Sequence, residues 1–363
     1  MKKTIITITG IRPDFIRMST IFKKLDDNFN HILIHSGQHY DKLLSDVFFD
    51  ELKIRKPDYN LEIGGKGKEH FHQLGDLSIK IIELIRNENL KPDMILFLGD
   101  SNSAACAVSL KKEGYTIGHI EAGMRSYDKR MLEEINRVVC DHCSDYLFVY
   151  HENYKQKALQ ENIKEEQIFV VGNTIVEVAK QYQEEIFKTP KRNNQIILDI
   201  HRPENFKYPH RLINIINYAN DMSKTFFNLP IKMLNFGRTE QMLKKFNIDL
   251  DKKNIELVPL MSFKTYLEAV YHSLFIISDS GTAQEEPSLF NTPVIVPRDF
   301  TERPESVENN CSVMLNVNKY DDSWPQATMY IIDILNGKIK INSDWLGNGN
   351  TSDLIIEKLN QLL

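Results

Sequence analysis

Three carboxylates stand at or just beyond short apolar runs in the first half of the chain. Asp100 follows the run 94–98, Glu121 closes the run 117–120, and Glu133 lies a little further along. Burying a carboxylate is costly unless it has a partner or a purpose, so Glu121 is difficult to explain as ordinary surface polarity. If the fold brings the three groups to one cleft, they suit the removal and return of a proton at a single centre.

Each carboxylate also has a structural interpretation. Asp100 is well placed to cap the next helix, which is the commoner use of such a residue. Glu133 and Arg137 are four residues apart and would share a helix face, as a surface ion pair does. Arg125 is a candidate partner that would neutralise Glu121. From these residues alone, both interpretations stay open.

The second half of the chain carries a histidine in a comparable position. His201 follows the run 196–200 and is a candidate acid, base or phosphate contact, with a purely structural histidine as the alternative. A further run, 274–278, is followed by a turn into a predicted helix. Glu286 lies one turn into that helix, where its carboxylate can accept hydroxyl groups of a ribose or a sugar.

Several groups suited to an anion lie at predicted helix starts. Backbone N–H groups at a helix start can bind an anion. The turn after residue 278 offers three small residues for such a site, Ser280, Gly281 and Thr282. Pro13 suits the first turn of a helix that places Arg12 and Arg17 within reach of an anion, with ordinary solvated arginines as the alternative. Arg303 marks a second place at which an arginine can meet phosphate.

Length and composition place these residues in a folded chain of two domains. The chain has 363 residues, 42% of them hydrophobic and 26% charged, which is typical of a globular protein too long for one ordinary core. Its longest apolar runs are much shorter than a membrane span, so no membrane partner is expected. A net charge of −5 argues against nucleic-acid binding. Four cysteines give no disulfide framework, and a cytoplasmic location is expected.

The elements that position these residues are predicted from short apolar runs that alternate with longer helical segments. Continuous apolar runs are typical of parallel strands buried on both faces. Strands are expected at 4–9, 31–35, 94–98, 117–120, 146–149, 168–171, 196–200, 231–235, 255–258, 274–278, 294–296 and 313–316, with helices such as 76–87 and 211–224 between them. The repeated βαβ pattern predicts an α/β fold of two Rossmann-like, doubly wound domains that face a central cleft.

The polar stretch 184–194 is the expected boundary between the domains, because its Thr-Pro-Lys-Arg-Asn-Asn segment breaks the preceding helix. This gives an N-terminal domain over residues 1–185 and a C-terminal domain over residues 186–363. The last segment, 352–363, has the apolar stripe of a helix. It packs either within its own domain or back onto the first.

Several other chemistries lack their sequence signatures. The chain contains neither G-x-x-x-x-G-K-[ST] nor G-x-G-x-x-G after a strand, so ATP and NAD binding have no motif. A nucleophile elbow of the G-x-S-x-G type is absent as well. Cys140 and Cys143 resemble half of a zinc site without a second pair, and a packed cysteine pair on a helix is favoured. Neither a metal nor a cofactor is expected.

Taken together, the motifs resemble the non-hydrolysing UDP-N-acetylglucosamine 2-epimerase family. The matching segments occur in the family's order over nearly the whole chain. They are Gly10–Arg17, Gly37–His39, Gly99–Ser101, His119–Arg125, Glu133–Arg137, Gly172–Thr174, His201–Arg202, Asp279–Gly281, Gln284–Glu286 and Thr301–Glu305. The resemblance implies a glycosyltransferase-B-like fold, a UDP-binding C-terminal domain and a homodimer.

The resemblance also implies a mechanism that uses the carboxylates. The proton on carbon 2 of a pyranosyl phosphate is not next to a free carbonyl, so its direct removal is very hard. The family eliminates UDP across carbons 1 and 2, holds the 2-acetamidoglycal, and adds UDP back after a proton returns to the opposite face. Carried over residue by residue, Asp100, Glu121 and Glu133 handle the proton. His201 would contact the leaving diphosphate and assist as an acid.

The same carry-over assigns the binding groups. The diphosphate would be held by Arg12, Ser280, Gly281 and Arg303, and the uridine ribose by Glu286. The expected substrate-binding set is completed by Arg17, which stands where the family often has lysine, and by Arg137 and Thr282.

Departures from the family's pattern bear on the sugar. Pro203 replaces a second arginine, Asn235 a histidine and Asp41 a glutamine or arginine of the members that are activated by a second UDP-N-acetylglucosamine. Thr282 stands in place of a double glycine. Activation by a second UDP-N-acetylglucosamine is therefore not expected to work in the same way. Pro203, Asn235 and Thr282 favour a resemblance to a sister branch that acts on UDP-2-acetamido-2,6-dideoxy-L-hexoses or UDP-2,3-diacetamido uronates. UDP-N-acetylglucosamine remains the default substrate, in the synthesis of surface-polysaccharide precursors.

Three competing functions share parts of this pattern. A hydrolysing relative would carry out the elimination and release UDP with a free sugar. A glycosyltransferase of the same architecture would need an acceptor, since a fold does not fix a function, but it needs fewer carboxylates at this point of the chain. A nucleotide-sugar sensor would bind without turnover.

Overall fold

The computed structural model describes residues 2–37, 49–64, 69–250 and 254–363. The chain forms two compact units, each taken by itself below. The first unit contains Met1–Val178 and Leu346–Leu363, and the second contains Ala179–Trp345. The division predicted at residue 185 lies within the same helix, α8 (Thr174–Ile186), as the observed one.

The first unit is built on a parallel sheet of seven strands in the order β3-β2-β1-β4-β5-β6-β7. These strands are β1 (Thr4–Thr9), β2 (Asn30–His35), β3 (Tyr59–Asn60), β4 (Met94–Leu98), β5 (Ile117–Ala122), β6 (Tyr146–Val149) and β7 (Ile168–Val170). At the centre of the sheet Ile5 of β1 pairs with Met94 of β4, and Leu98 of β4 pairs with Ile120 of β5.

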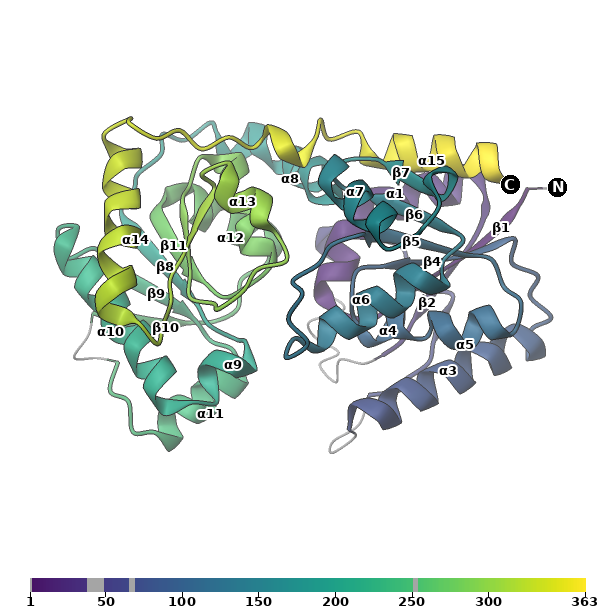
Figure 1. The fold of residues 1–363 in the computed structure, drawn as a ribbon, viewed down its shortest axis with the longest axis horizontal. Helices are drawn as coiled ribbons and strands as arrows, with labels where there is room; N and C mark the ends of the chain where they lie inside the picture. The colour runs from purple at the N-terminus through teal and green to yellow at the C-terminus, as the bar shows by residue number, and fades with distance from the viewer. Residues whose placement is uncertain (1, 38–48, 65–68, 251–253) are drawn as a thin grey trace. The chain divides into compact units, whose positions relative to one another are not determined.

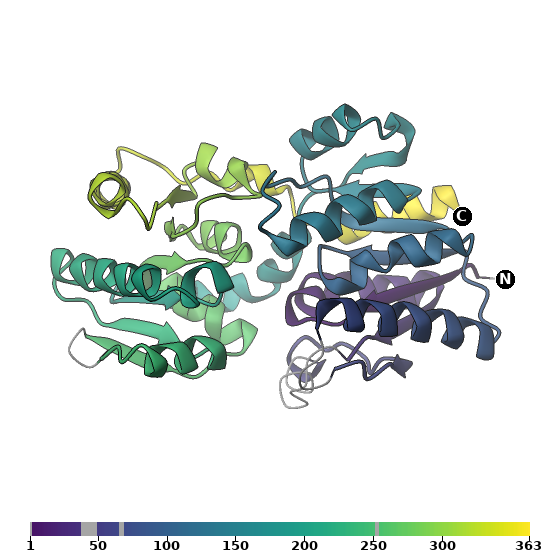
Figure 2. The same cartoon turned by 60° about the horizontal axis from the view of Figure 1, so that its bottom comes forward.

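Helices cover both faces of this sheet, which explains why its strands read as continuous apolar runs (Figure 1, Figure 2). On one face Ile5 and its neighbours pack against α1 (Arg12–Asn28), α7 (Glu152–Gln160) and α15 (Thr351–Leu362). On the other face Ile6 and Ile8 pack against α3 (His70–Asn87), α4 (Asn102–Ala105), α5 (Ala107–Lys112) and α6 (Leu132–Cys143). A short 3-10 turn, η1 (Glu165–Gln167), precedes β7.

The C-terminal helix belongs to the first unit, where α15 lies beside α1 (Figure 1). Ser352 ties its first turn to Glu177 of α8, donating from its backbone N–H at 2.9 Å and from its hydroxyl at 2.5 Å. Ile355 and Leu359 are buried in the same core as Phe15 of α1. The predicted apolar stripe of residues 352–363 is therefore what attaches the chain end to the first unit.

The second unit repeats the arrangement with a parallel sheet of six strands in the order β10-β9-β8-β11-β12-β13. These strands are β8 (Gln195–Asp199), β9 (Ile231–Leu234), β10 (Ile255–Val258), β11 (Ser273–Ser278), β12 (Val294–Val296) and β13 (Ser312–Met314). The connections contain α9 (Pro203–Phe206), α10 (Pro209–Thr225), α11 (Gly237–Lys245), α12 (Phe263–His272), η3 (Thr282–Gln284), η4 (Glu286–Phe290), α13 (Pro304–Glu308), α14 (Tyr320–Leu335) and η5 (Asp344–Leu346).

The predicted α/β class with two doubly wound parallel sheets is confirmed. Each predicted run forms a strand, with ends that differ by one or two residues, as assignments of element ends commonly do. The two-residue strand β3 was not predicted, because Tyr59–Asn60 is too short and too polar to stand out. Among the described residues, no helix is both long enough and apolar enough to cross a bilayer.

Both sheets reverse their strand order at the centre, and this is where open parallel sheets bind ligands. In the first sheet the reversal lies between β1 and β4, and in the second between β8 and β11. The segments that leave the carboxyl ends of these strands begin at Gly10, Gly99, Ile200 and Asp279. Of the residues predicted to do chemistry, Asp100 and His201 follow strands that flank a reversal, whereas Glu121 lies on the next strand, β5.

Candidate active site

Glu121 has a left-handed backbone conformation within strand β5. Its φ of +69° lies in the left-handed region, and the pairing of β5 with β6 shifts register between Ile120 and Ala122. A non-glycine residue there costs roughly 1–3 kcal/mol and persists only where the surroundings enforce it. Such a bulge turns a side chain away from the direction that the strand pleat would give it.

The Glu121 carboxylate is buried among polar partners. Arg17 Nη1 of α1 lies 3.0 Å from Glu121 Oε2, and the two side chains are 2% and 8% exposed. The Tyr150 hydroxyl donates to the same oxygen at 3.2 Å and shares a hydrogen bond of 2.8 Å with the Thr174 hydroxyl. Arg17 also donates to Asn173 Oδ1 at 3.4 Å. The expected partner Arg125 was therefore wrong, because the ion pair of Glu121 is made by Arg17.

Asp100 lies in the loop after β4 and remains partly open to solvent, with a quarter of its side chain exposed. Its carboxylate forms an ion pair with Arg137 Nη2 of α6, and its carbonyl oxygen accepts from the Asn136 amide at 2.9 Å. The helix cap in this loop is Ser101, whose hydroxyl accepts from the Ser103 N–H at 3.3 Å. Asp100 is consequently positioned by α6 and is not the capping residue.

Glu133 and Glu134 are adjacent on α6 but differ in environment. Glu134 is buried, and its carboxylate accepts backbone N–H groups of Ser126 and Tyr127 at 2.8–3.1 Å and an Arg137 Nη1–H at 2.8 Å. Glu133 is half-buried in the first turn of the helix. Arg137 thus joins Asp100 to Glu134, and Glu134 anchors the loop that follows β5.

A buried charge network lies beneath the Asp100 and Glu121 loops. His119 Nε2 donates to the Gly99 carbonyl at 2.8 Å, while its Nδ1 lies 2.6 Å from Asp141 Oδ1. Burial acts to lower the pKa of His119, but its neighbours Cys140 and Asp141 raise it well above the usual range. Arg125 completes the network with contacts of 2.7 Å to Asp141 and 2.6 Å to Glu161. This network fixes the backbone from which Asp100 projects.

Asp14, on the first turn of α1, is a further carboxyl of this region. It is 3% exposed, and its Oδ2 accepts the N–H groups of Gly10 and Ile11 at 3.3 and 3.4 Å. Burial raises its pKa to about 8 against the lowering effect of these hydrogen bonds, and the charges of Asp100 and Glu121 raise it further. Asp14 is therefore protonated at neutral pH and adds no third negative charge beside Asp100 and Glu121.

The raised pKa of Asp14 predicts a pH-dependent stability. The folded state binds one more proton than the unfolded chain between the ordinary pKa of 3.8 and about 8, so this stabilisation is complete below 3.8 and is lost as the pH rises through about 8. Asp14→Asn does not titrate. We subtract the unfolding free energy of Asp14→Asn from that of the native chain. Between pH 3.8 and about 8 this difference should fall by up to about 1.4 kcal/mol for each pH unit. Urea unfolding at several pH values measures it, and parallel curves would show that Asp14 is ionised.

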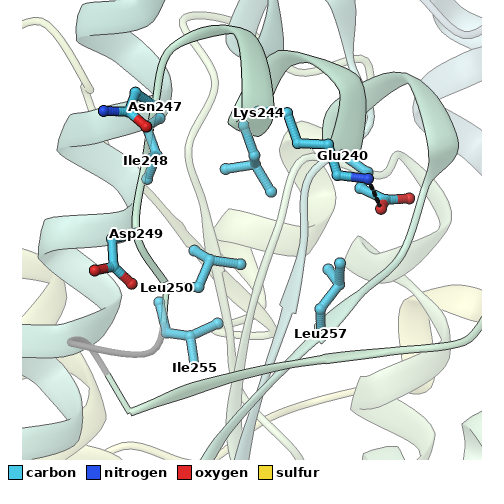
Figure 3. A pocket seen from close by; sticks show the side chains of 9 residues that line it. Glu240, Lys244, Asn247, Ile248, Asp249, Leu250, Ile255 and Leu257 are labelled. Carbon is cyan, nitrogen blue, oxygen red and sulfur yellow. Dashed lines mark hydrogen bonds and ion pairs between the residues drawn. The ribbon is translucent and has the colours of Figure 1, made fainter.

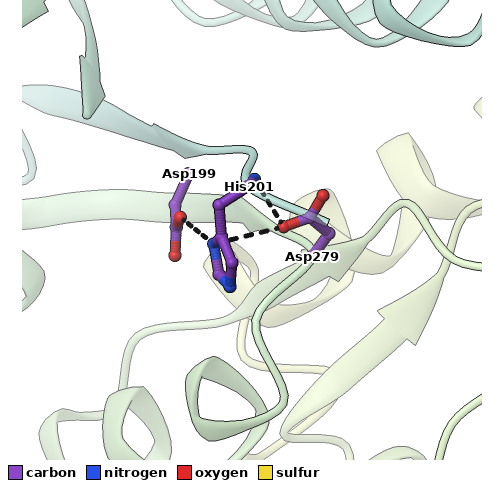
Figure 4. A group of neighbouring side chains, drawn as sticks. All are labelled: Asp199, His201 and Asp279. Carbon is purple, nitrogen blue, oxygen red and sulfur yellow. Dashed lines mark hydrogen bonds and ion pairs between the residues drawn. The ribbon is translucent and has the colours of Figure 1, made fainter. Parts of the chain in front are cut away.

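In the second unit, His201 follows β8 and stands beside two aspartates (Figure 4). His201 Nδ1 lies 2.9 Å from Asp199 Oδ1 and 3.4 Å from Asp279 Oδ1. The Phe236 ring lies against the imidazole with centroids 4.7 Å apart. Since Asp199 and Asp279 end neighbouring strands on the two sides of the sheet reversal, His201 occupies the expected ligand-binding position of this unit.

The Ser280–Thr282 turn follows β11, but the helix predicted after it was wrong. Two 3-10 segments, η3 and η4, stand in its place, because Pro287 interrupts the chain just after Glu286. The Ser280 N–H donates to the Ser278 hydroxyl at 3.0 Å, and the Ser280 and Thr282 hydroxyls lie 3.1 Å apart. Glu286 is buried at the start of η4. An anion here would be bound by a tight turn and not by the dipole of a long helix.

Arg303 lies directly beneath this turn in a buried ionic cluster. Its Nε donates to Glu285 Oε1 at 2.7 Å, and its Nη1 pairs with Glu302. Glu302 also pairs with the buried Arg298 at 3.0 Å. A Cβ on Gly281 would lie 2.6 Å from Glu302 Oε1 and 2.7 Å from Arg303 Nη1. The Arg303 side chain therefore packs directly against the turn, and only glycine fits at position 281.

Substituting this glycine should destabilise the second unit. We expect Gly281→Ala to cost about 1–3 kcal/mol in unfolding free energy, because the buried Glu302 and Arg303 must move to admit the methyl group. Gly237→Ala is the matched control, since a Cβ there meets nothing within 4 Å. Chemical denaturation of both variants measures the difference, and equal stability of the two would show that the turn is loosely packed.

The remaining predicted residues are placed as follows. Arg12 is half-buried at the start of α1, and Thr282 is half-buried at the start of η3. Gln38, His39 and Asp41 of the resemblance lie outside the described residues. Cys140 is buried and Cys143 half-buried, and both are free thiols.

A separate hollow of about 470 Å³ lies beside the edge strand β10 (Figure 3). Its lining comes from α11, from β10 and from the segment between them, and is largely aliphatic. Its ion pair joins Lys244 and Glu240 at 2.6 Å, one turn apart on α11. The lining includes none of the residues predicted to bind or react, so this hollow has no part in the site.

Sequence reasoning missed several residues that shape the site. Tyr150 directly follows the apolar strand β6, so the rule that selected Asp100 would also have found it. Asp199 is a carboxylate within a buried strand, which is a comparable signal. Asp14 gave no such signal, because an acidic residue in the first turn of a helix is ordinary.

Comparison with known proteins gives a consistent result. Residues 23–360 match the model of a family described as UDP-N-acetylglucosamine 2-epimerase. A UDP-N-acetylglucosamine 2-epimerase of Methanocaldococcus jannaschii is 34% identical, with 97% of each chain covered. A UDP-2,3-diacetamido-2,3-dideoxy-D-glucuronate 2-epimerase of Pseudomonas aeruginosa is 33% identical over 86% of this chain and 88% of its own. The crystal structure of the M. jannaschii UDP-GlcNAc 2-epimerase in complex with UDP-GlcNAc and UDP superposes with a TM-score of 0.86, at 32% identity and 99% coverage of both chains.

Proposed function

The chain belongs to the UDP-N-acetylglucosamine 2-epimerase family and is therefore an isomerase, and on that premise we propose that it interconverts UDP-N-acetylglucosamine and UDP-N-acetylmannosamine. The reaction inverts carbon 2 by elimination and re-addition of UDP. The observation that carries this proposal is Glu121, held in a left-handed conformation on a strand bulge with its carboxylate paired to Arg17. Backbone strain of this kind is concentrated at reactive sites.

The chemistry assigned to the first unit is proton transfer. In the forward step a carboxylate takes the proton from carbon 2, and the electron pair of that C–H bond forms the carbon 1–carbon 2 double bond. The carbon 1–oxygen bond breaks as this double bond forms, and its electron pair leaves on UDP. In the return step UDP adds to carbon 1 and a proton adds to the other face of carbon 2. Asp100, Glu121 and Glu133 supply these groups, because two faces need donors and acceptors of their own.

The second unit supplies the groups for UDP. His201 contacts the departing diphosphate, and the turn of Ser280, Gly281 and Thr282 offers hydroxyl and backbone N–H donors to it. Glu286 accepts the ribose hydroxyls. The first unit adds Arg12, Arg17 and Arg137 to substrate binding, and Arg303 of the second unit acts on the turn as well as on the charge of the diphosphate. No group in this scheme is redox-active.

The assembly, the setting and the exact sugar complete the proposal. We expect a homodimer in the cytoplasm that supplies a precursor for surface polysaccharide. A relative named for a diacetamido-glucuronate is nearly as similar as those named for UDP-N-acetylglucosamine, so a modified UDP-2-acetamido sugar is the second candidate substrate. Both substrates require the same inversion at carbon 2.

The test is incubation of the purified chain with UDP-N-acetylglucosamine alone, followed by proton and phosphorus NMR. We expect the UDP conjugate of N-acetylmannosamine to form and reach equilibrium with the UDP linkage intact. Accumulation of free UDP and sugar would show a hydrolysing enzyme, and an unchanged donor that reacts only when an acceptor is added would show a transferase. If the chain turns over a UDP-linked dideoxyhexose or diacetamido-uronate and not UDP-N-acetylglucosamine, the modified sugar is the substrate.

A further inference from the structure

His201 is held on one side of its ring by two carboxylates that no known role of the chain accounts for. Its Nδ1 lies 2.9 Å from Asp199 and 3.4 Å from Asp279, while its Nε2 points away from both (Figure 4). Both aspartates are buried, and 29% of the His201 side chain is exposed. The imidazole therefore faces two buried negative charges with Nδ1 and has Nε2 on its other side.

The oxygens of the two aspartates are already occupied by hydrogen-bond donors. Asp279 Oδ1 accepts the His201 N–H at 3.0 Å, and its Oδ2 accepts the Arg202 N–H at 3.1 Å and the Asn205 amide at 2.9 Å. Asp199 Oδ2 accepts the Ser278 hydroxyl at 2.8 Å. A cation bound to Nδ1 and both carboxylates would have to replace the Nδ1 hydrogen of His201 and share oxygens that already accept these donors. The arrangement accordingly suits an ion pair with a protonated histidine better than a metal site.

The charges around the ring set its protonation. An ionised carboxylate only accepts, so the hydrogen of His201 lies on Nδ1, and a second hydrogen on Nε2 is then stabilised by two negative charges. Burial acts to lower the pKa of His201, but Asp199 and Asp279 outweigh it and raise the pKa against a smaller opposing effect of Arg202. The ring of Phe236, which carries no charge, lies beside the imidazole.

We propose that Asp199 is a positioning residue that, together with Asp279, keeps His201 as an imidazolium with its Nε2–H presented to the departing diphosphate. The proposal rests on the proposed function for the identity of that anion. A preformed cation with one free N–H stabilises the negative charge that develops on the UDP oxygen as the carbon 1 bond breaks, and can give it a proton. Asp199 thus acts on the substrate only through His201.

Asp199 is the better of the two aspartates to test. Asp279 also anchors the backbone of residues 201 and 202, so its removal would disturb the loop itself. Asp199→Asn removes the charge and keeps an oxygen that accepts from Nδ1, while its amide NH2 faces the Ser278 hydroxyl, which must then act as the acceptor. Asp333→Asn is the matched control, because Asp333 is a half-buried aspartate of α14 that pairs with Lys338 at 3.1 Å.

The direct readout is the histidine NMR spectrum of the full chain, with the His201 signal identified by its loss in His201→Gln. We expect the His201 titration midpoint to fall in Asp199→Asn and to stay in place in Asp333→Asn. An equal midpoint in the native chain and Asp199→Asn would overturn the proposal. A shift of the His201 signal on adding zinc or magnesium chloride would also overturn it, in favour of a cation site.

Kinetics provide the second readout. With UDP-N-acetylglucosamine, Asp199→Asn should lower kcat by about 10-fold or more, change KM by less than about threefold, and move the loss of activity on the alkaline side to lower pH. An unchanged pH profile would contradict the positioning role. If the native chain turns over no UDP sugar, the proposed function fails, while the NMR titration still decides whether Asp199 holds His201 protonated.

Discussion

Glu121→Gln is expected to lower turnover of UDP-N-acetylglucosamine by at least about 10³-fold while UDP still binds. The glutamine has nearly the same shape but cannot take or return a proton. The UDP-binding groups His201, Ser280 and Glu286 belong to the other compact unit, and Arg12 of α1 is not altered either. Turnover by NMR and UDP affinity by calorimetry are the two measurements.

Two controls separate chemistry from folding in this experiment. Tyr150→Phe removes one hydrogen bond of 3.2 Å to Glu121 and should cost far less turnover than the loss of the carboxylate. Glu113→Gln alters an exposed glutamate whose ion pair with Arg86 lies on the surface, so its activity should be native. A Glu121→Gln variant that keeps more than about a tenth of native turnover would contradict the proton-transfer role.

Arg17→Met should be the most destabilising of these substitutions, at about 3–5 kcal/mol in unfolding free energy. The arginine and Glu121 form a buried ion pair, and methionine fills much of the space while leaving the Glu121 charge without its cation. Turnover should fall as well, because Glu121 would lose its orientation. Urea unfolding followed by circular dichroism measures the loss, with the surface variant Lys23→Met as control.

A double-mutant cycle distinguishes this pairing from a role of Arg17 in phosphate binding. If Arg17 mainly neutralises Glu121, then Arg17→Met should cost at least about 1 kcal/mol less stability in a Glu121→Gln background. Additive effects would mean that the two side chains act independently. UDP affinity that falls in Arg17→Met without loss of stability would return Arg17 to substrate binding, as the family resemblance implies.

The strands and the positions of the reactive residues were predictable because both depend on local patterns. A strand buried on both faces is a continuous apolar run, and its carboxyl end is marked by the first polar residue after the run. Asp100 and His201 were found in this way, each beside the reversal of its sheet. The parallel arrangement followed from the alternation of strands and helices.

The partners of these residues could not be predicted in the same way. Arg17 and Glu121 are brought together by the packing of α1 against the sheet, whereas Arg125 is close to Glu121 in sequence and contacts Asp141. The left-handed conformation of Glu121 is likewise imposed by the register shift between β5 and β6. Charge pairs and backbone strain of this kind depend on tertiary packing, which leaves no local pattern in the sequence.

The protonation states lie beyond the sequence for the same reason. Asp14 and Asp199 are both buried aspartates, yet desolvation raises the pKa of Asp14 to about 8, whereas Asp199 lies beside His201 and raises the pKa of that histidine. The difference arises from desolvation and neighbouring charge, which only the folded chain defines.

In the proposed reaction, carbon 2 is inverted by removal and return of a proton, with UDP as the leaving group. Incubation with UDP-N-acetylglucosamine in deuterium oxide, followed by NMR and mass spectrometry of the recovered conjugates, tests it most directly. We expect deuterium at carbon 2, in both epimers once equilibrium is reached, with the UDP linkage kept and no incorporation by Glu121→Gln. Failure to incorporate deuterium into any UDP-2-acetamido sugar of a panel that includes the dideoxyhexose and diacetamido-uronate conjugates would contradict it.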